Sequence, residues 1–141
     1  MKNIFTLFLT LTTLSLLAQT SSEADKIIGT YETEEKNGHV QVYKSGDKYF
    51  GKLVWIDEPD ALDENNPDKS KRNNKVMGMV ILTNFVYQGN GVYGDGKLYD
   101  PDSGNTYSGK MTLQSNGDLK MRGYVGISLF GRNSYWTRLK K

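Results

Sequence analysis

The sequence contains no cysteine and only one histidine, and these two shortages exclude several kinds of chemistry. Without cysteine, the chain has no thiol catalysis, no disulfide and no lipid-modified N-terminal cysteine. A metal site built from several histidines is excluded as well, and we expect neither a metal nor another cofactor. His39 begins an expected strand after Gly38, and no Gly-x-Ser-x-Gly elbow surrounds any serine. We therefore interpret His39 as a half-exposed strand residue, not a general base, and predict no catalytic residue.

An excess of charge of one sign is also missing. The 141 residues include 18 Lys and Arg and 16 Asp and Glu, which gives a net charge of +2. This near balance gives no reason to expect nucleic acid or an anionic membrane as a partner. The glycines stand in turn-like positions and not between a strand and a helix, so no phosphate-binding loop is present.

No apolar run is long enough to span a bilayer, which takes about 20 residues. The uncharged run Ile4–Leu17, which is apolar or hydroxylic throughout, follows the positive charge of Lys2 and ends before the small residue Ala18. This order is typical of a secretory signal peptide. We expect residues 1–18 to be removed, which leaves 141 − 18 = 123 residues as one domain, 19–141, with no transmembrane segment. The mature protein is then exported to the periplasm or beyond the cell.

Turn signals recur at short intervals through this domain and predict an all-β fold. Pairs such as Asn37-Gly38 and Asn116-Gly117 supply the positive φ that tight hairpins need. From Tyr107 to Val125, apolar or small residues alternate with polar ones on both sides of Asn116-Gly117, which indicates a hairpin with one face in water. Further strands are expected at Ile27–Thr33, Val40–Lys44, Lys48–Ile56, Val76–Tyr87, Val92–Tyr99 and Tyr135–Leu139. About eight strands favour a small antiparallel β-barrel, whose closure removes exposed edges.

The segment Asp57–Asn74 differs from the rest of the domain. It contains Pro59, Pro67 and many acidic or amide residues without apolar periodicity, so we expect a long, solvated acidic loop. Calcium is the alternative for its carboxylates, but Pro67 breaks the ligand spacing of an EF-hand. Loops of this length are often functional, and the loop with the apolar run Val76–Tyr87 could meet a protein partner of the cell envelope.

A hydrolase that uses carboxylates is the least favoured alternative function. Its candidate acids are the pair Asp100 and Asp102, and Asp68. The pair flanks Pro101 before Ser103-Gly104, which is ordinary turn chemistry.

The aromatic residues give the best reason to expect a ligand site. An eight-stranded barrel is just wide enough to be filled by side chains or to hold one small ligand, so a packed core and a cavity both remain open. Trp136 and Arg138 share a face of the last strand, and the guanidinium can stack on a ring such as Tyr31 and close one end of the barrel. Arg122 is expected on the solvent face. Our predicted ligand contacts are Tyr31, Trp55, Tyr99 and Trp136, with Arg132 as an anion anchor.

Several blocks in order resemble a known family. They are Met77-Gly78-x-x-Ile81-Leu82, Gly96-Lys97-Leu98-Tyr99-Asp100-Pro101, Arg122-Gly123-Tyr124-x-Gly126, Phe130-Gly131-Arg132 and Trp136-x-Arg138. Together they are similar to the bacterial domain of unknown function 2147 family over nearly the whole mature chain. The resemblance implies an exported, lipocalin-like (calycin-like) barrel, with Tyr31 in place of the usual tryptophan and Asn133 in place of the usual threonine. By analogy of fold, it implies binding of a small apolar or amphipathic ligand.

Overall fold

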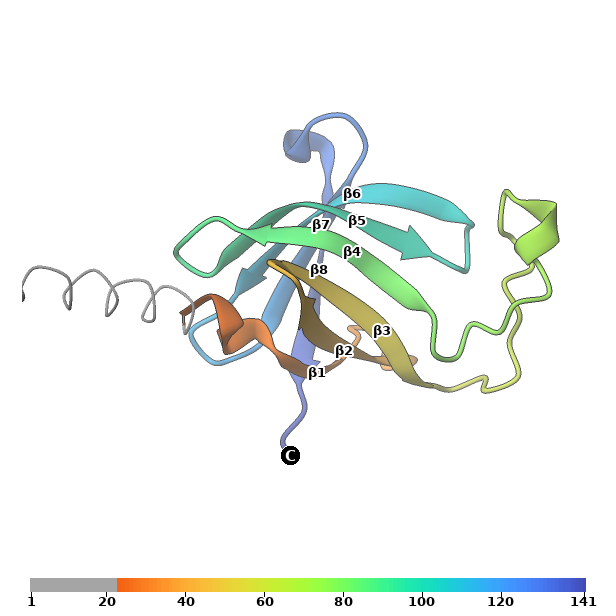
Figure 1. The fold of residues 1–141 in the computed structure, drawn as a ribbon, viewed down its shortest axis with the longest axis horizontal. Coiled ribbons are helices and arrows are strands. Elements are labelled where there is room, and N and C mark those ends of the chain that lie inside the picture. Colours follow the sequence, from red (N-terminus) through yellow and green to blue (C-terminus); the bar gives the residue numbers. More distant parts are fainter. Residues whose placement is uncertain (1–22) are drawn as a thin grey trace, which may run out of the picture.

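The computed structural model describes residues 23–141 and shows a closed barrel of eight antiparallel strands (Figure 1). Each strand pairs with the next one in the chain, and the last pairs with the first. The strands are β1 (Gly29–Glu32), β2 (Gly38–Ser45), β3 (Lys48–Ile56), β4 (Val80–Tyr87), β5 (Val92–Asp100), β6 (Asn105–Leu113), β7 (Leu119–Tyr124) and β8 (Arg132–Arg138). The predicted all-β barrel of about eight strands is therefore confirmed. The predicted signal peptide lies outside the described residues.

The starts of two strands, β4 and β8, differ most from those predicted. β4 begins at Val80 and not at Val76, because Gly78 adopts a φ of 83° and turns the chain before the ladder starts. β8 begins at Arg132 and not at Tyr135. The first residues of β8 are polar, so the sequence predicted a loop there. In the structure Asn133 lies opposite Arg122 and extends the β7–β8 ladder.

The middle of the barrel is filled by side chains. Phe85 of β4 is fully buried, and its ring lies against Gly96 of β5 and Gly109 of β6. A Cβ atom on either glycine would come within 2.4 or 2.6 Å of that ring, so only glycine fits at both positions. Around it pack Val40, Val42, Leu82, Tyr93, Met111, Leu119 and Met121. The two methionines face each other across the β6–β7 pair, as the alternation predicted.

A short segment before β1 closes one end of the barrel. It includes the 3-10 helix η1 (Asp25–Ile27) and buries Ala24 and Ile27, although Ile27 was predicted to start a strand. The hydroxyls of three inward-facing tyrosines donate to this segment. Tyr31 bonds the carbonyl of Ile27 (2.7 Å), Tyr49 the carboxylate of Asp25 (2.6 Å) and Tyr93 the carbonyl of Ala24 (2.5 Å). The segment therefore acts as a hydrogen-bonded plug.

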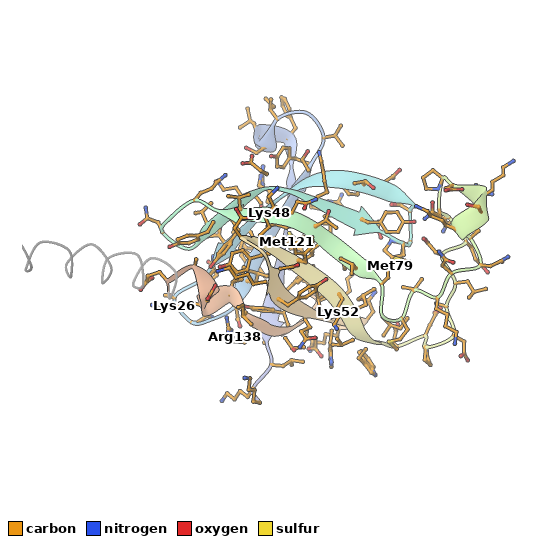
Figure 2. The ribbon with its side chains drawn as sticks, viewed as in Figure 1. Lys26, Lys48, Lys52, Met79, Met121 and Arg138 are labelled. Carbon is orange, nitrogen blue, oxygen red and sulfur yellow. The ribbon has the colours of Figure 1, made fainter. Side chains whose placement is uncertain are left out.

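Arg138 fastens the plug to the last strand. Its guanidinium lies 5.0 Å from the centre of the Tyr31 ring, which confirms the predicted stacking. The same group donates to the carbonyls of Lys26 (2.6 Å) and Gly117 (3.0 Å) and to the Tyr31 hydroxyl. Figure 2 shows Arg138 and Lys26 together at this end of the barrel.

Candidate functional site

The long β3–β4 connection folds back onto its own barrel. It carries a second 3-10 helix, η2 (Lys69–Lys71), and reaches the β5–β6 turn, on the side of the molecule away from η1 (Figure 1). There Asn65 donates from its side-chain amide to the carbonyl of Asp102 (2.8 Å). Gly104 has a φ of 74° and lies so close that a Cβ atom would meet the Asn65 carbonyl. The predicted long loop is present, but it is docked on the barrel.

Asp63 is the anchor of this loop. We expected a solvated acid, but its side chain is 1% exposed. It accepts hydrogen bonds from the Tyr99 hydroxyl (2.6 Å) and from the Asn66 amide (2.7 Å), which replace the lost water. Burial and the bond to Asp63 together raise the pKa of Tyr99 to about 12. The Asp63–Tyr99 contact thus fixes the loop against β5.

Tyr99 stands on the outer face of the barrel wall. Leu82 and Leu98 are paired and face inward, so Lys97 and Tyr99 point outward by the alternation of β5. The loop therefore covers the outer surface of β4, β5 and β6. Ile81, on this surface, is only 6% exposed, so part of the apolar run predicted to meet a protein partner is covered from within the chain. The envelope partner itself stays a prediction.

Between the loop and this outer wall lies a groove with a volume of about 470 Å³. The loop contributes one side, and β4, β5 and β6 contribute the floor and the other side. The lining residues are Asp63, Asn66, Pro67, Lys71, Asn74, Met79, Val80, Ile81, Thr83, Lys97, Tyr99 and Thr106. Figure 2 shows Met79 where the loop enters β4.

The lining of the groove combines apolar surface with positive charge. Met79, Val80 and Ile81 form an apolar strip at the start of β4. Lys71 from η2 and Lys97 from β5 supply two ammonium groups on opposite sides, and Lys97 donates to the hydroxyl of Ser108 (3.1 Å). The one carboxylate in the lining, Asp63, is already occupied by Tyr99 and Asn66. The free charges of the lining are therefore cationic.

The five predicted ligand contacts do not form one site. Tyr99 lines the groove, but Tyr31 and Trp136 are buried in the barrel interior, where the Trp136 indole donates to Ser134 (3.0 Å). Trp55 is 41% exposed on the outer face, and Arg132 is exposed at the start of β8.

Trp55 belongs to a small outer cluster with His39. The two rings are 4.6 Å apart, and the Nε2 atom of His39 lies 3.4 Å from the carboxylate of Glu32. His39 is partly exposed, which confirms that it is a half-exposed strand residue. A β-bulge beside it places Val54 and Trp55 both outward, against the simple alternation.

Two of the remaining candidate acids, Asp68 and Asp100, have structural partners. Asp100 caps the β5–β6 turn by accepting from the backbone of Asp102 (3.0 Å) and the hydroxyl of Ser103 (2.7 Å), as expected of turn chemistry. Asp68 accepts from Ser70 at the start of η2. Among residues 23–141, no three His, Cys, Asp or Glu side chains gather as a metal-ligand set.

Arg122 lies on the outer face of β7, as the alternation predicted, and its side chain is bound to the β7–β8 loop. Its guanidinium donates to the carbonyls of Ser128 (2.6 Å) and Leu129 (3.2 Å) and to the amide oxygen of Asn133 (2.7 Å). The sequence prediction missed Lys71 and Lys97. Their joint position depends on how the loop docks, which no local pattern encodes.

A family model matches residues 29–138, which include all eight strands, and it is described as an uncharacterized protein conserved in bacteria (DUF2147). The chain belongs to this family. Among solved structures, the family member is similar to the protein HP1028 from the human pathogen Helicobacter pylori, described as belonging to the lipocalin family. The TM-score is 0.76 at 27% identity, over 81% of this chain and 83% of that one. No curated protein matches.

The lipocalin-like architecture and the predicted family are therefore both confirmed. Within the part that the structure describes, none of the helices has the length and hydropathy needed to cross a membrane.

Proposed function

We propose that this DUF2147 family member is an exported lipocalin-like barrel that binds a small amphipathic molecule with an anionic head group. The groove between the β3–β4 loop and the outer wall carries the proposal. Its volume of about 470 Å³ is in the range of sites for small molecules. An apolar strip with a few placed polar groups is the usual lining of such sites.

The charges of the groove select the kind of head group. Lys71 reaches it from the loop and Lys97 from β5, while the Asp63 carboxylate accepts hydrogen bonds from Tyr99 and Asn66. A carboxylate or phosphate can lie between the ammonium groups while an acyl chain covers Met79 and Val80. A neutral or cationic head group gains no such contact.

The barrel interior is the alternative place for a ligand, as in the sequence-based prediction. Phe85 occupies its centre and η1 closes one end, so a ligand there would have to displace packed side chains. Interiors packed in this way resist added volume. The groove offers the same chemistry without that displacement.

The proposal is tested by calorimetric titration of the mature protein with decanoate, a medium-chain carboxylate, and with decanol as the uncharged counterpart. We expect decanoate to bind and decanol to bind more weakly. The double variant Lys71→Met, Lys97→Met should weaken decanoate binding about tenfold, since two charge contacts are lost. Lys48→Met, in the exposed β2–β3 hairpin, is the matched control.

Two results would overturn this assignment. One is equal affinity for decanoate in the double variant and in the wild type. The other is the absence of binding to either probe together with the absence of a releasable small molecule, by native mass spectrometry, on protein taken from its own host.

Export is tested separately on the same native material. The pattern of residues 1–18 supports cleavage after Ala18, so N-terminal sequencing should begin at Gln19. Protein that starts at Met1 and fractionates with the cytoplasm would contradict export without affecting the groove.

A further inference from the structure

The β7–β8 loop exposes more apolar side chain than any other connection described in residues 23–141. Val125 is 74% exposed, Ile127 57%, Leu129 74% and Phe130 79%. The loop holds the 3-10 helix η3 (Ser128–Phe130) and projects from the barrel at the top of Figure 1. Four large, exposed apolar residues within six positions make this loop an apolar patch, and such patches on soluble proteins mark contact surfaces.

Contacts of its backbone hold this loop against the barrel wall and leave its apolar side chains exposed. The Arg122 guanidinium reaches from the outer face of β7 to the carbonyls of Ser128 and Leu129, and to Asn133 on β8. Gly131 passes so close that a Cβ atom would lie 2.8 Å from the Gly123 carbonyl. This clamp holds the carbonyls against the wall and keeps the side chains directed away from it.

The protein around the patch is basic. The two strands that carry the loop have no Asp or Glu, and Arg122 and Arg132 lie at the ends of these strands next to it, whereas Arg138 lies at the opposite end of β8. Lys110 of β6 lies opposite Arg122, Lys120 lies on the same outer face of β7 two residues farther from the loop, and Arg132 directly succeeds the loop. The net charge of the whole chain conceals this local excess, because the acids concentrate in the β1–β2 and β3–β4 connections.

We propose that the β7–β8 loop docks the barrel onto a lipid bilayer that carries anionic head groups. The apolar side chains enter the boundary between head groups and acyl chains, and Lys110, Lys120 and Arg132 lie against the phosphates. Apolar insertion flanked by basic residues is the physical pattern of reversible interfacial binding. The positive surroundings fit a negatively charged bilayer better than a neutral apolar partner. The site is distinct from the groove, and the inference does not depend on a ligand there.

The test is flotation of the mature protein with phosphatidylcholine vesicles that contain or lack phosphatidylglycerol. The wild type should float with the anionic vesicles, and rising salt should reduce the bound fraction. Leu129→Ser with Phe130→Ser should lower the vesicle partition coefficient about tenfold or more. Val54→Ser with Leu62→Ser changes two partly exposed apolar side chains elsewhere on the protein and should leave partition unchanged.

A second pair of changes separates charge from insertion. Lys110→Gln with Lys120→Gln should lower partition into anionic vesicles about tenfold and change little with phosphatidylcholine alone. Circular dichroism confirms that each variant is folded.

The proposal is overturned if the wild type does not float with anionic vesicles, or if the Leu129, Phe130 variant floats as well as the wild type. Self-association of the free protein that the same two substitutions abolish, without vesicle binding, would instead assign the patch to a second copy of the chain.

Discussion

Replacing Arg138 with methionine tests how the plug is held. Methionine keeps an unbranched apolar chain of similar length but removes the guanidinium, which lies over the Tyr31 ring and donates to the carbonyls of Lys26 and Gly117. The ring contact in a partly exposed position is worth about 1 kcal/mol. Each of the two carbonyl bonds adds about 1 kcal/mol net. We therefore expect the free energy of unfolding to fall by about 3 kcal/mol, a large share of the stability of a small domain.

The assay is urea unfolding followed by tryptophan fluorescence, with the free energy taken from the midpoint and slope of each transition. Arg132→Met is the matched control, because the same substitution is made on the same strand at an exposed position. It should change the free energy by about 0.5 kcal/mol or less. Arg138→Lys should fall between the two, since an ammonium keeps the charge but cannot bridge the same acceptors.

A difference below about 0.5 kcal/mol between the Arg138→Met and Arg132→Met variants would refute the reasoning. It would mean that the tyrosine hydroxyls alone hold the plug and that the guanidinium contacts merely exchange with water. An altered urea slope would be informative too, because it would show that the loss of Arg138 loosens the native barrel.

Three further predictions concern the core, the pH response and the loop. Gly109→Ala should lower the free energy of unfolding, measured in urea, by about 1–3 kcal/mol, because the new Cβ atom meets the Phe85 ring at 2.6 Å. A stability equal to that of the wild type would show that the ring has room to move. Burial raises the pKa of Tyr31 from 10.0 to about 12, so its stabilising effect is complete below pH 10 and is lost as the pH rises toward 12. The difference in absorbance at 295 nm between the wild type and Tyr31→Phe should show this tyrosine ionising later than free tyrosine, and a difference that titrates at pH 10 in the folded protein would contradict burial. Tyr99→Phe leaves the buried Asp63 without its hydroxyl partner. Hydrogen exchange in the β3–β4 loop should therefore accelerate, and the free energy of unfolding should fall by about 1–3 kcal/mol. Unchanged exchange would show that the loop docks without this bond.

The β6–β7 hairpin shows what could be predicted from sequence. Alternation around Asn116-Gly117 correctly placed Met111 and Met121 on the inner face, because each residue's direction follows from its neighbours within one ladder. The stacking of Arg138 on Tyr31 was also accessible, since both residues sit on strands whose order in a closed barrel is fixed.

Features that depend on distant or irregular contacts could not be read in this way. Asp63 looks like any other loop acid, because the hydroxyl that buries it is 36 residues away on β5. Trp55 was expected to face inward, but a bulge near His39 shifts the alternation by one position. The groove exists only once the β3–β4 loop has docked on the barrel. The sequence pattern therefore indicated Tyr99 but not Lys71 and Lys97, which line the groove with it.

The seam between β1 and β8 has a consequence for how the chain matures. Every other pairing in the barrel joins neighbouring strands, whereas this one brings Tyr31 opposite Arg138 through only two residue pairs. Contacts between neighbours can form as the chain emerges, but a contact across 107 positions has to wait for the whole domain. Closure is thus a terminal event that requires a free N-terminal segment and the last strand at the same time. Until both are available, β1 and β8 are edge strands whose unpaired N–H and C=O groups can pair with another chain, so the unclosed barrel is the state most exposed to aggregation.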